Sequence, residues 1–299
     1  MLELKNISVA YKDKKVLDNL SLTANPGEII GLVAPNGTGK TTLFHVIANF
    51  LKPQSGQVIF NGKHVYRSEK EELFIHKQMT TFPDQSDLFE ELTGVDHMKL
   101  YGNMWKGKTN HIPEIIAQLH MNDYVKRKVR TYSLGMRQRL CFAMMAAADT
   151  PIMLMDEVMN GLDLSNVALI SERLIEMKRE KKLIFVASHL LDNLDIYADR
   201  VLFLKDGDII YQQQLNEEDE VYIKIALELE QYRKVNEDYE LPAGHHYIAG
   251  RLLCIPFGGM ELAEQIKWIE RLLAFKELEL TIGPLGTVEY YEKYYHDTE

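Results

Sequence analysis

The feature that most constrains this chain is a turn of small residues between an apolar strand and a helix. Glu28–Val33 is a continuous apolar run, as expected for a buried strand. It leads into Ala34-Pro35-Asn36-Gly37-Thr38-Gly39, and a helical pattern begins at Lys40. Small residues let backbone N–H groups turn inward around a phosphate, and the helix N-terminus adds its dipole. This order of elements predicts a layered α/β domain that binds a nucleotide.

Two side chains after the turn suit the outer phosphates of such a nucleotide. Lys40 can reach them with its ammonium group, and the Thr41 hydroxyl can ligate Mg²⁺. The usual loop has glycine five places before Gly39, where this chain has Ala34, so we expect a negative φ there. The candidate nucleotide-binding residues of this segment are Ala34, Pro35, Asn36, Gly37, Thr38, Gly39, Lys40, Thr41 and Thr42.

A second apolar strand ends in two adjacent carboxylates. Ile152–Met155 is apolar, and Asp156 and Glu157 follow it directly. Because side chains alternate along a strand, the two carboxylates are expected to diverge into different roles. Asp156 suits Mg²⁺, held through water, and Glu157 can orient and deprotonate an attacking water. With the phosphate turn, this pair predicts hydrolysis of the bound nucleotide.

Charge divides the chain into two predicted units. The sequence holds 34 Lys+Arg and 44 Asp+Glu, a net charge of −10, which argues against non-specific nucleic-acid binding. All of this excess lies in residues 216–299, with 8 Lys+Arg and 18 Asp+Glu, whereas residues 1–215 hold 26 of each. The two cysteines have no paired spacing, and no apolar run is long enough to span a membrane. We therefore expect a cytosolic chain with a domain at 1–215 and an acidic extension at 216–299.

The remaining pattern predicts further strands and helices on both sides of that boundary. Alternation over Leu2–Val9 indicates a half-buried strand. Further predicted elements of the first unit are a helical stretch over Met98–Leu119 with a break between Gly107 and Pro113, a strand over Leu183–Ala187 and a hairpin over Val201–Tyr211. In the extension the pattern predicts helices over Glu217–Lys234 and Met260–Phe275 and a strand over Leu278–Ile282.

Three further motifs make residues 1–215 resemble the ATP-binding cassette (ABC) ATPases. Tyr132-Ser133-Leu134-Gly135-Met136 resembles the signature motif of that family, with departures at Tyr132, Leu134 and Met136. Gly161-Leu162-Asp163 resembles its D-loop, and Ser188-His189 its switch histidine. The resemblance implies an α/β P-loop ATPase with a RecA-like core, an N-terminal antiparallel β subdomain and a helical subdomain at about 90–148. The extension is expected to be a small α+β unit.

The resemblance also assigns roles to individual residues. Lys40, Glu157 and His189 become the expected catalytic residues, with His189 sensing the γ-phosphate. Ser133 and Gly135 match positions that contact the γ-phosphate of ATP bound to the opposite subunit. Tyr11 stands where the family places an aromatic that stacks on adenine. The expected cofactors are accordingly ATP and Mg²⁺.

The segment Phe82–Thr93 resembles the Q-loop of the family, which ligates Mg²⁺ and couples to the membrane partner. Aligning its proline, its Leu-Phe pair and its Leu-Thr pair puts Asp84 at the glutamine position, so Asp84 is the expected metal ligand beside Thr41 and Asp156. A shift of one residue would place Gln85 there instead, and both readings stay open.

The resemblance predicts a transporter subunit. Two copies, or this chain and a paralogue, are expected to close head-to-tail on two ATP–Mg and to drive a separate integral-membrane permease from the cytoplasmic face, without binding nucleic acid. The signature and the tail segment Gly283–Tyr291 resemble bacterial exporters of drugs, antimicrobials or toxin-like peptides, which favours export. The alternatives are a soluble ABC ATPase not coupled to transport, or an importer subunit. The extension is expected to serve dimerisation or regulation.

Overall fold

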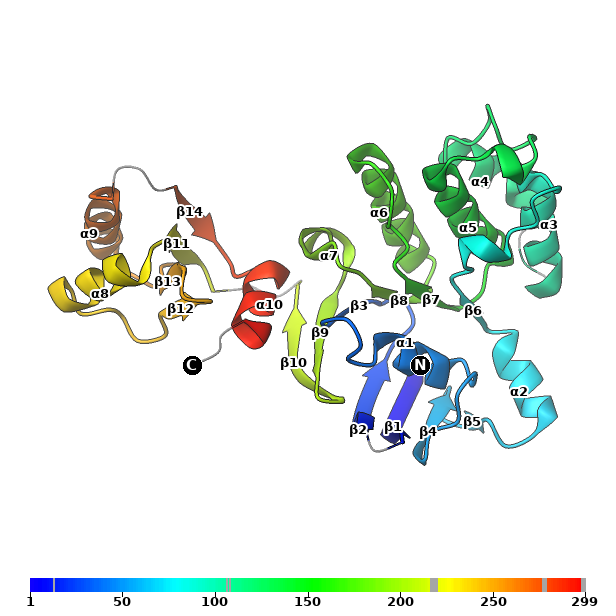
Figure 1. Ribbon diagram of the computed structural model, residues 1–299, viewed down its shortest axis with the longest axis horizontal. Coiled ribbons are helices and arrows are strands. Elements are labelled where there is room, and N and C mark those ends of the chain that lie inside the picture. Colours follow the sequence, from blue (N-terminus) through cyan, green and yellow to red (C-terminus); the bar gives the residue numbers. More distant parts are fainter. Residues whose placement is uncertain (13, 106, 108, 216–219, 276–278, 297–299) are drawn as a thin grey trace. The chain divides into compact units, whose positions relative to one another are not determined.

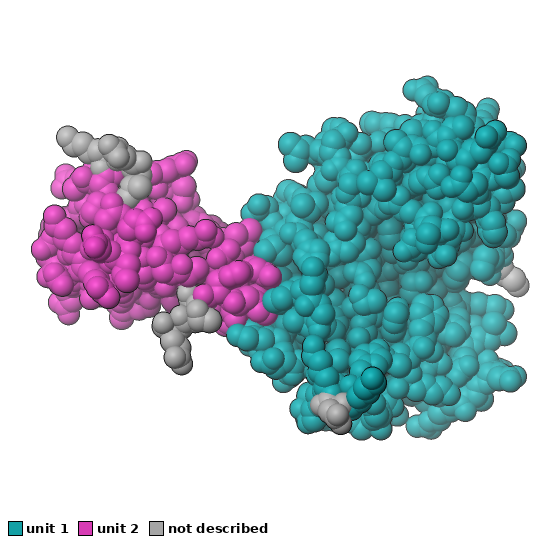
Figure 2. All heavy atoms as spheres, viewed as in Figure 1, with its two compact units in different colours: residues 1–214 teal, residues 215–299 magenta. Residues whose placement is uncertain are grey.

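The computed structural model of the chain describes residues 1–12, 14–105, 107, 109–215, 220–275 and 279–296. Backbone contacts divide the chain into two compact units, Met1–Gln214 and Leu215–Glu299, which are coloured separately in Figure 2. They are called unit 1 and unit 2 below.

Unit 1 is built on a six-stranded sheet in which five strands run parallel and the edge strand β10 is antiparallel (Figure 1). Its spatial order is β10-β9-β3-β8-β7-β6. The strands are β3 (Ile29–Val33), β6 (Met79–Thr81), β7 (Ile152–Asp156), β8 (Leu183–Ala187), β9 (Arg200–Lys205) and β10 (Asp208–Gln214). Strands β3 and β8 are buried along their whole length, which explains why their sequences are apolar without alternation.

A second, antiparallel sheet of unit 1 has the order β2-β1-β4-β5. Its strands are β1 (Leu2–Tyr11), β2 (Lys14–Ala24), β4 (Ser55–Phe60) and β5 (His64–Val65). Helix α1 (Lys40–Ile47) shares one buried apolar cluster with both sheets, to which Leu4 of β1, Val46 of α1 and Phe185 of β8 belong. The aromatic rings of Phe44 and Phe185 meet edge to face, with centroids 6.4 Å apart. Burial between two sheets therefore fixes the position of α1.

Helices form the rest of unit 1, and α3, α4 and α5 gather into a group of their own (Figure 1). The α-helices are α2 (Glu69–His76), α3 (Gly94–Trp105), α4 (Ile112–Gln118), α5 (Leu134–Ala148), α6 (Leu164–Arg179) and α7 (Leu191–Tyr197). Short 3₁₀ turns are η1 (Gln85–Asp87), η2 (Thr109–His111) and η3 (Val129–Thr131). Helix α5 is buried on nearly all sides from Leu140 onward. None of the helices in the described part of the chain combines the length and apolarity needed to cross a bilayer.

Unit 2 is a four-stranded antiparallel sheet with the order β12-β13-β11-β14. Its elements are β11 (Tyr222–Ala226), α8 (Leu229–Asp238), β12 (His246–Ile248), β13 (Leu252–Pro256), α9 (Leu262–Leu273), β14 (Leu280–Gly283) and α10 (Thr287–Tyr295). The chain order β-α-β-β-α-β with this sheet order is the ferredoxin-like arrangement. Ile223 and Ile225 pack in one core with Trp268 of α9, and Tyr222 packs on the other face with Leu285.

The prediction of a helix over Glu217–Lys234 is wrong in its first half. Residues 217–219 lie outside the described part, and Tyr222–Ala226 form the central strand β11. Acidic residues on both sides gave the whole segment a helical appearance. The alternation of apolar and polar residues in β11 is confined to Ile223-Lys224-Ile225, which is too short a run to indicate a strand by itself. The helix begins only at Leu229.

We expect Phe185→Ala to reduce the free energy of unfolding of unit 1 by about 3–5 kcal/mol, because it removes a large, fully buried ring from the shared core. Urea unfolding followed by circular dichroism measures the change. The control is Phe50→Ala, at a side chain that is 64% exposed, which should change the free energy by less than about 0.5 kcal/mol. Equal losses in the two variants would contradict the placement of Phe185.

Candidate functional site

The candidate phosphate turn connects β3 to α1 and needs glycine where the helix begins. Gly39 caps α1 with a φ of 114°, in the left-handed region that favours glycine. A Cβ atom at this position would lie 3.0 Å from both Cγ1 and the carbonyl oxygen of Val16 in β2. Backbone conformation and close packing therefore both require glycine here.

Lys40 holds its ammonium group inside the turn. Its side chain is buried, and Nζ donates to the carbonyl oxygens of Ala34 at 2.5 Å and Pro35 at 3.2 Å. Burial lowers the pKa of Lys40, and the nearby carboxylates of Glu157 and Asp156 partly oppose that shift. Ala34 keeps a non-positive φ, as expected from the sequence. The ammonium thus rests on neutral carbonyls, which an anionic phosphate could replace as its partner.

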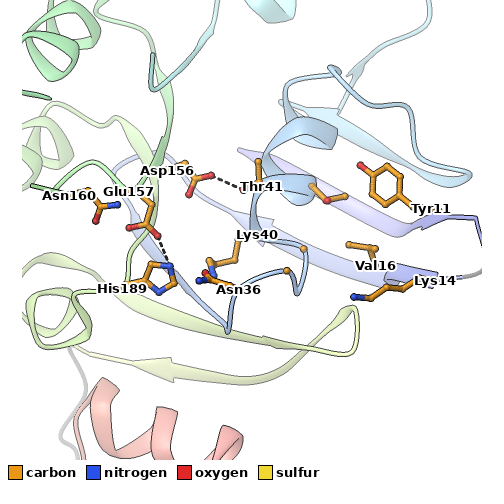
Figure 3. A pocket seen from close by; sticks show the side chains of 13 residues that line it. Tyr11, Lys14, Val16, Asn36, Lys40, Thr41, Asp156, Glu157, Asn160 and His189 are labelled. Atoms are coloured by element: carbon orange, nitrogen blue, oxygen red, sulfur yellow. Dashed lines mark hydrogen bonds and ion pairs between the residues drawn. The ribbon is translucent and has the colours of Figure 1, made fainter. Parts of the chain in front are cut away.

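The two carboxylates at the end of β7 have different partners. Asp156 Oδ2 accepts a hydrogen bond of 2.8 Å from Thr41 Oγ1, whereas Glu157 Oε1 lies 2.9 Å from His189 Nε2 (Figure 3). The divergence agrees with the prediction, but strand alternation alone does not produce it. Glu157 leaves the strand in a left-handed conformation with a φ of 53°, which is uncommon for any residue but glycine.

The Glu157 carboxylate has one oxygen, Oε2, that is buried without a hydrogen-bond partner among the described residues, and its pKa is raised. Burial is the main cause that raises the pKa of Glu157, and Asp156 adds to it, while His189 and Lys40 act in the opposite direction. A carboxylate with one free acceptor atom and a raised pKa is suited to take a proton from water.

These groups meet in an open cleft of about 720 Å³. In Figure 3 the carboxylates and His189 lie on one side of the cleft, Tyr11, Lys14 and Val16 lie on the other, and Lys40 projects between them. The lining residues are Tyr11, Lys14, Val16, Asn36, Gly37, Gly39, Lys40, Thr41, Thr42, Asp156, Glu157, Asn160 and His189. Tyr11 is half exposed, so a flat ring could stack on it.

Three predicted turn residues do not line the cleft but shape the turn beneath it. Ala34 and Pro35 supply the carbonyl oxygens that hold Lys40. The hydroxyl of Thr38 donates to the carbonyl oxygen of Pro35 at 2.7 Å, which closes the turn. Their contribution is therefore to the shape of the loop.

The predicted signature residues lie away from this cleft. Ser133 is exposed and caps α5, its Oγ accepting a bond of 3.3 Å from the Met136 N–H. A Cβ atom at Gly135 would lie 3.6 Å from the carbonyl oxygen of Gly161, so the signature and the D-loop-like segment are neighbours. The structure thus presents Ser133 to solvent rather than to the cleft of its own chain.

Asp84 and Gln85 make different contacts. The Asp84 carboxylate is exposed and accepts from the backbone N–H and the hydroxyl of Ser86, both at 2.7 Å, and these bonds lower the pKa of Asp84. The Gln85 amide donates to Gln138, whose own amide donates to the carbonyl oxygen of Glu157 at 2.8 Å. Gln85 is therefore linked to the backbone of Glu157. A metal-binding role for Asp84 stays a prediction.

Sequence reasoning missed four residues at the site. Asn160 lines the cleft, and its position between the carboxylate pair and Gly161-Leu162-Asp163 could have indicated it. Gln138 follows the signature directly, so its position in the motif was also an available clue. Lys14 and Val16 belong to β2, which the pattern did not predict, and no local feature distinguishes them.

The residues present fit a magnesium ion. Thr41 Oγ1 and Asp156 Oδ2 are oxygen donors 2.8 Å apart, and oxygen is the ligand type that Mg²⁺ prefers. No group of three or more His, Cys, Asp or Glu side chains that could hold a metal occurs among the described residues. A pair of protein oxygens agrees with an ion that takes its other ligands from phosphates and water.

The known proteins that this chain resembles in sequence belong to one family. Residues 17–160 match the family described as "ABC transporter". The chain is 32% identical over 220 residues to the uncharacterized ABC transporter ATP-binding protein YhcH of Bacillus subtilis, covering 73% of this chain and 71% of that one. It is 27% identical over 214 residues to the lantibiotic transport ATP-binding protein SrtF of Streptococcus pyogenes, covering 72% and 91%.

Among solved structures, the dimeric post-hydrolysis state of the ATP-binding cassette MJ0796 bound to ADP and Pi superimposes with a TM-score of 0.64. The identity is 22%, and the match covers 73% of this chain and all of that one. This likeness, with the α/β layers described above, confirms the predicted fold class.

We expect Glu157→Gln to raise the free energy of unfolding at pH 8 by about 0.5–2 kcal/mol. Because the pKa of Glu157 is raised in the folded state, the folded protein retains this proton where the unfolded chain has lost it. The stability due to this group is therefore present at low pH and is lost as the pH rises through the raised pKa. Urea unfolding at pH 8 and pH 5 should show a smaller gain at pH 5.

The control is Glu69→Gln, at an exposed carboxylate in the first turn of α2. It should not stabilise the protein at either pH. A destabilising effect of Glu157→Gln at pH 8 would contradict this, because it would show that the charged carboxylate makes more favourable interactions than its buried, unpartnered oxygen indicates.

Proposed function

The chain belongs to the ABC transporter family and is an ATP-binding cassette that hydrolyses ATP, and from this premise we propose that it powers a separate membrane permease. The proposed cargo is a drug, an antimicrobial or a toxin-like peptide, moved outward from the cytoplasmic face of the membrane. The observation that carries the catalytic part is the convergence of Lys40, Asp156, Glu157 and His189 in one cleft.

Each group in the cleft has a proposed task toward ATP. The α1 N-terminus and the Lys40 ammonium bind the β- and γ-phosphates, for which Lys40 exchanges its present carbonyl partners. Thr41 and Asp156 hold Mg²⁺, which when bound neutralises phosphate charge. Glu157 accepts the proton of the attacking water on its free Oε2. His189 positions Glu157 through their 2.9 Å contact and lies where it can sense the γ-phosphate.

Self-association is proposed to complete this site. Ser133 is exposed at the N-terminus of α5, where it can meet a phosphate bound to a second chain. Two large apolar side chains are also exposed here: Leu134, within the signature, by 61%, and Leu164, directly after the D-loop-like segment, by 87%. Their exposure agrees with a surface that a second cassette covers. The match to a dimeric cassette supports the same arrangement.

A second cavity, of about 800 Å³, supports docking of a permease. Phe50, Tyr101, Asp84 and Gln85 help to line it, and it reaches Thr41, Asp156 and Glu157 at the catalytic cleft. Phe50 is 64% exposed, so its ring is available to an apolar side chain of a partner. A segment bound here would contact Gln85, which is linked through Gln138 to the backbone of Glu157. Two hydrogen bonds thus connect the proposed docking cavity to the backbone of Glu157.

Two observations favour export as the direction of transport. The tail segment Gly283–Tyr291 and the signature resemble exporters of drugs and antimicrobials. One relative that matches over 91% of its own length is named for lantibiotic transport. Both favour outward movement of a peptide or drug over import or a soluble role.

We expect Glu157→Gln to lower the rate of ATP hydrolysis by about 10²–10⁴-fold, because it removes the base that takes the proton from water. The same variant should form a dimer in ATP–Mg²⁺ that sedimentation velocity detects. Adding Gly135→Asp, which places a negative charge at the proposed γ-phosphate contact, should prevent that dimer while ATP binding persists. Hydrolysis by Glu157→Gln at the wild-type rate would overturn the assignment of the base.

We expect the chain to co-purify from detergent-solubilised cells of its source with a multi-span membrane protein. Phe50→Glu should reduce the recovered partner by at least about tenfold, since it places a charge in the docking cavity. Leu73→Glu, at a side chain 57% exposed on α2, is the matched control and should not reduce it. Recovery of the chain alone, with ATPase activity intact, would favour a soluble ATPase instead.

A further inference from the structure

The backbone of Glu157 stands in a conformation that the residue would not keep by itself. Its φ of 53° lies in the left-handed region, which is unfavourable for a residue with a Cβ atom. Such a conformation persists only where the surrounding structure holds it in place. The hydrogen bonds that reach this backbone therefore decide where the carboxylate of the proposed base points.

The side chain of Gln138 supplies two of these hydrogen bonds. Gln138 lies in the second turn of α5 and is buried. Its Nε2 donates to the carbonyl oxygen of Glu157 and to that of Val158, both at 2.8 Å. The first bond fixes the peptide group that follows Glu157, and the second fixes the next one. One amide group therefore holds two consecutive peptides directly after the proposed base.

Two further bonds restrain the same residue. The Glu157 N–H donates to the carbonyl oxygen of Ala187 in β8 at 3.0 Å, and the Asn160 N–H donates to the Glu157 carbonyl at 3.1 Å. The bond from Asn160 belongs to the turn itself, whereas Ala187 and Gln138 come from distant segments. Glu157 is thus held to β8 through its N–H and to α5 through its carbonyl.

Glutamine suits position 138 better than any similar side chain. Both carbonyl oxygens accept from Nε2, which has two N–H groups to give, and Oε1 accepts from the Gln85 amide. This network determines which way the Gln138 amide is turned. Glutamate would lack both donors, asparagine would end one methylene short, and lysine or arginine would bury a charge.

We propose that Gln138 is a positioning residue for ATP hydrolysis. By holding the two peptides after Glu157, it keeps that carboxylate beside His189 (Figure 3), with Oε2 unpaired for the attacking water. Gln138 lines the second cavity and not the catalytic cleft, so it acts through Glu157 and not on the nucleotide. The inference rests on the proposed role of Glu157 as the base, and it adds the residue that sets the geometry of that base.

Loss of the Gln138 amide would release the strained backbone. The buried Val158 carbonyl would lose this donor, and Glu157 could relax toward a right-handed conformation. Because the direction of the Cα–Cβ bond changes with φ, the carboxylate would then leave its place beside His189. Lys40 has its own partners in the phosphate turn, so ATP binding should persist.

Steady-state hydrolysis and ATP binding by Gln138→Met test the proposal, because methionine has a similar length but no N–H donor. The kcat should fall by about 10–100-fold, the loss expected when a reacting group is misplaced by about 1 Å. The Kd for ATP, measured by equilibrium dialysis, should change by less than about twofold. Gln138→Asn should act in the same direction and serves if the methionine variant does not fold. An unchanged kcat, or a rise in Kd that accounts for the loss, would overturn the proposal.

Combination with Glu157→Gln shows whether Gln138 acts through the base. In that background Gln138→Met should change the residual single-turnover rate by less than about twofold, because no base is left to misplace. A further loss of about 10–100-fold there would overturn the proposal. The ATP-dependent dimer of Glu157→Gln should also survive the second substitution, and its loss would show that Gln138 supports association instead.

Thr80→Val is the matched control for stability. Thr80 is buried on β6 with its Oγ1 2.8 Å from that of Thr150, so valine removes a buried hydrogen bond from the same sheet at a residue that does not line the cleft. Urea unfolding should show a lower midpoint for Thr80→Val and for Gln138→Met, but only Gln138→Met should lose kcat. Equal losses of kcat at equal losses of midpoint would overturn the proposal, because general destabilisation would then explain both.

Hydrogen–deuterium exchange of the full chain without nucleotide tests the restraint apart from hydrolysis. Residues 157–160 should exchange faster in Gln138→Met than in the wild type or in Thr80→Val, because their turn is released. Unchanged exchange would overturn the proposal. Hydrolysis by Glu157→Gln at the wild-type rate would overturn the proposed base itself, whereas slow hydrolysis by Glu157→Gln with an unchanged kcat of Gln138→Met would overturn the positioning role alone.

Discussion

The parallel alignment of β3, β8 and β7 is the constraint on which the rest of unit 1 depends. Parallel strands end at the same edge of a sheet, so the loops that follow them meet there. Lys40 follows β3, Glu157 follows β7 and His189 follows β8, and all three side chains line one cleft. The register is fixed by strands that are buried on both faces and cannot shift without exposing apolar surface. Packing of the sheet thereby positions the catalytic groups.

The same sheet holds the catalytic groups in an arrangement that costs folding free energy. Glu157 has a left-handed backbone, a buried oxygen without a partner among the described residues, and a raised pKa. Lys40 is buried with its ammonium on neutral carbonyl oxygens. Each of these costs folding free energy. A bound phosphate would pair with the Lys40 ammonium, and a bound water would supply a donor to the buried oxygen of Glu157. We interpret the cost as preorganisation for ATP, because the groups already stand where charge will develop.

Each unit, taken by itself, leaves large apolar side chains exposed. In unit 1 these are Leu134 and Leu164, beside a signature serine that faces solvent. In unit 2 they are Leu262, Ile266 and Leu273 of α9 and Ile282 of β14. The first set surrounds a proposed phosphate contact, whereas the second belongs to the outer helix and edge strand of unit 2. We therefore assign the first set to the proposed ATP-dependent contact.

The sequence by itself determined the elements whose chemistry is local. The strand–turn–helix around Lys40, the carboxylates after β7 and the histidine after β8 each depend on a few adjacent residues, and their fold class is confirmed. Only the tertiary structure decided contacts between distant segments. It placed Val16 against Gly39, linked Gln85 through Gln138 to Glu157, and made Tyr222–Ala226 a central strand. A local pattern records which face of an element is apolar, but it does not record what that face meets, because the neighbour comes from elsewhere in the chain.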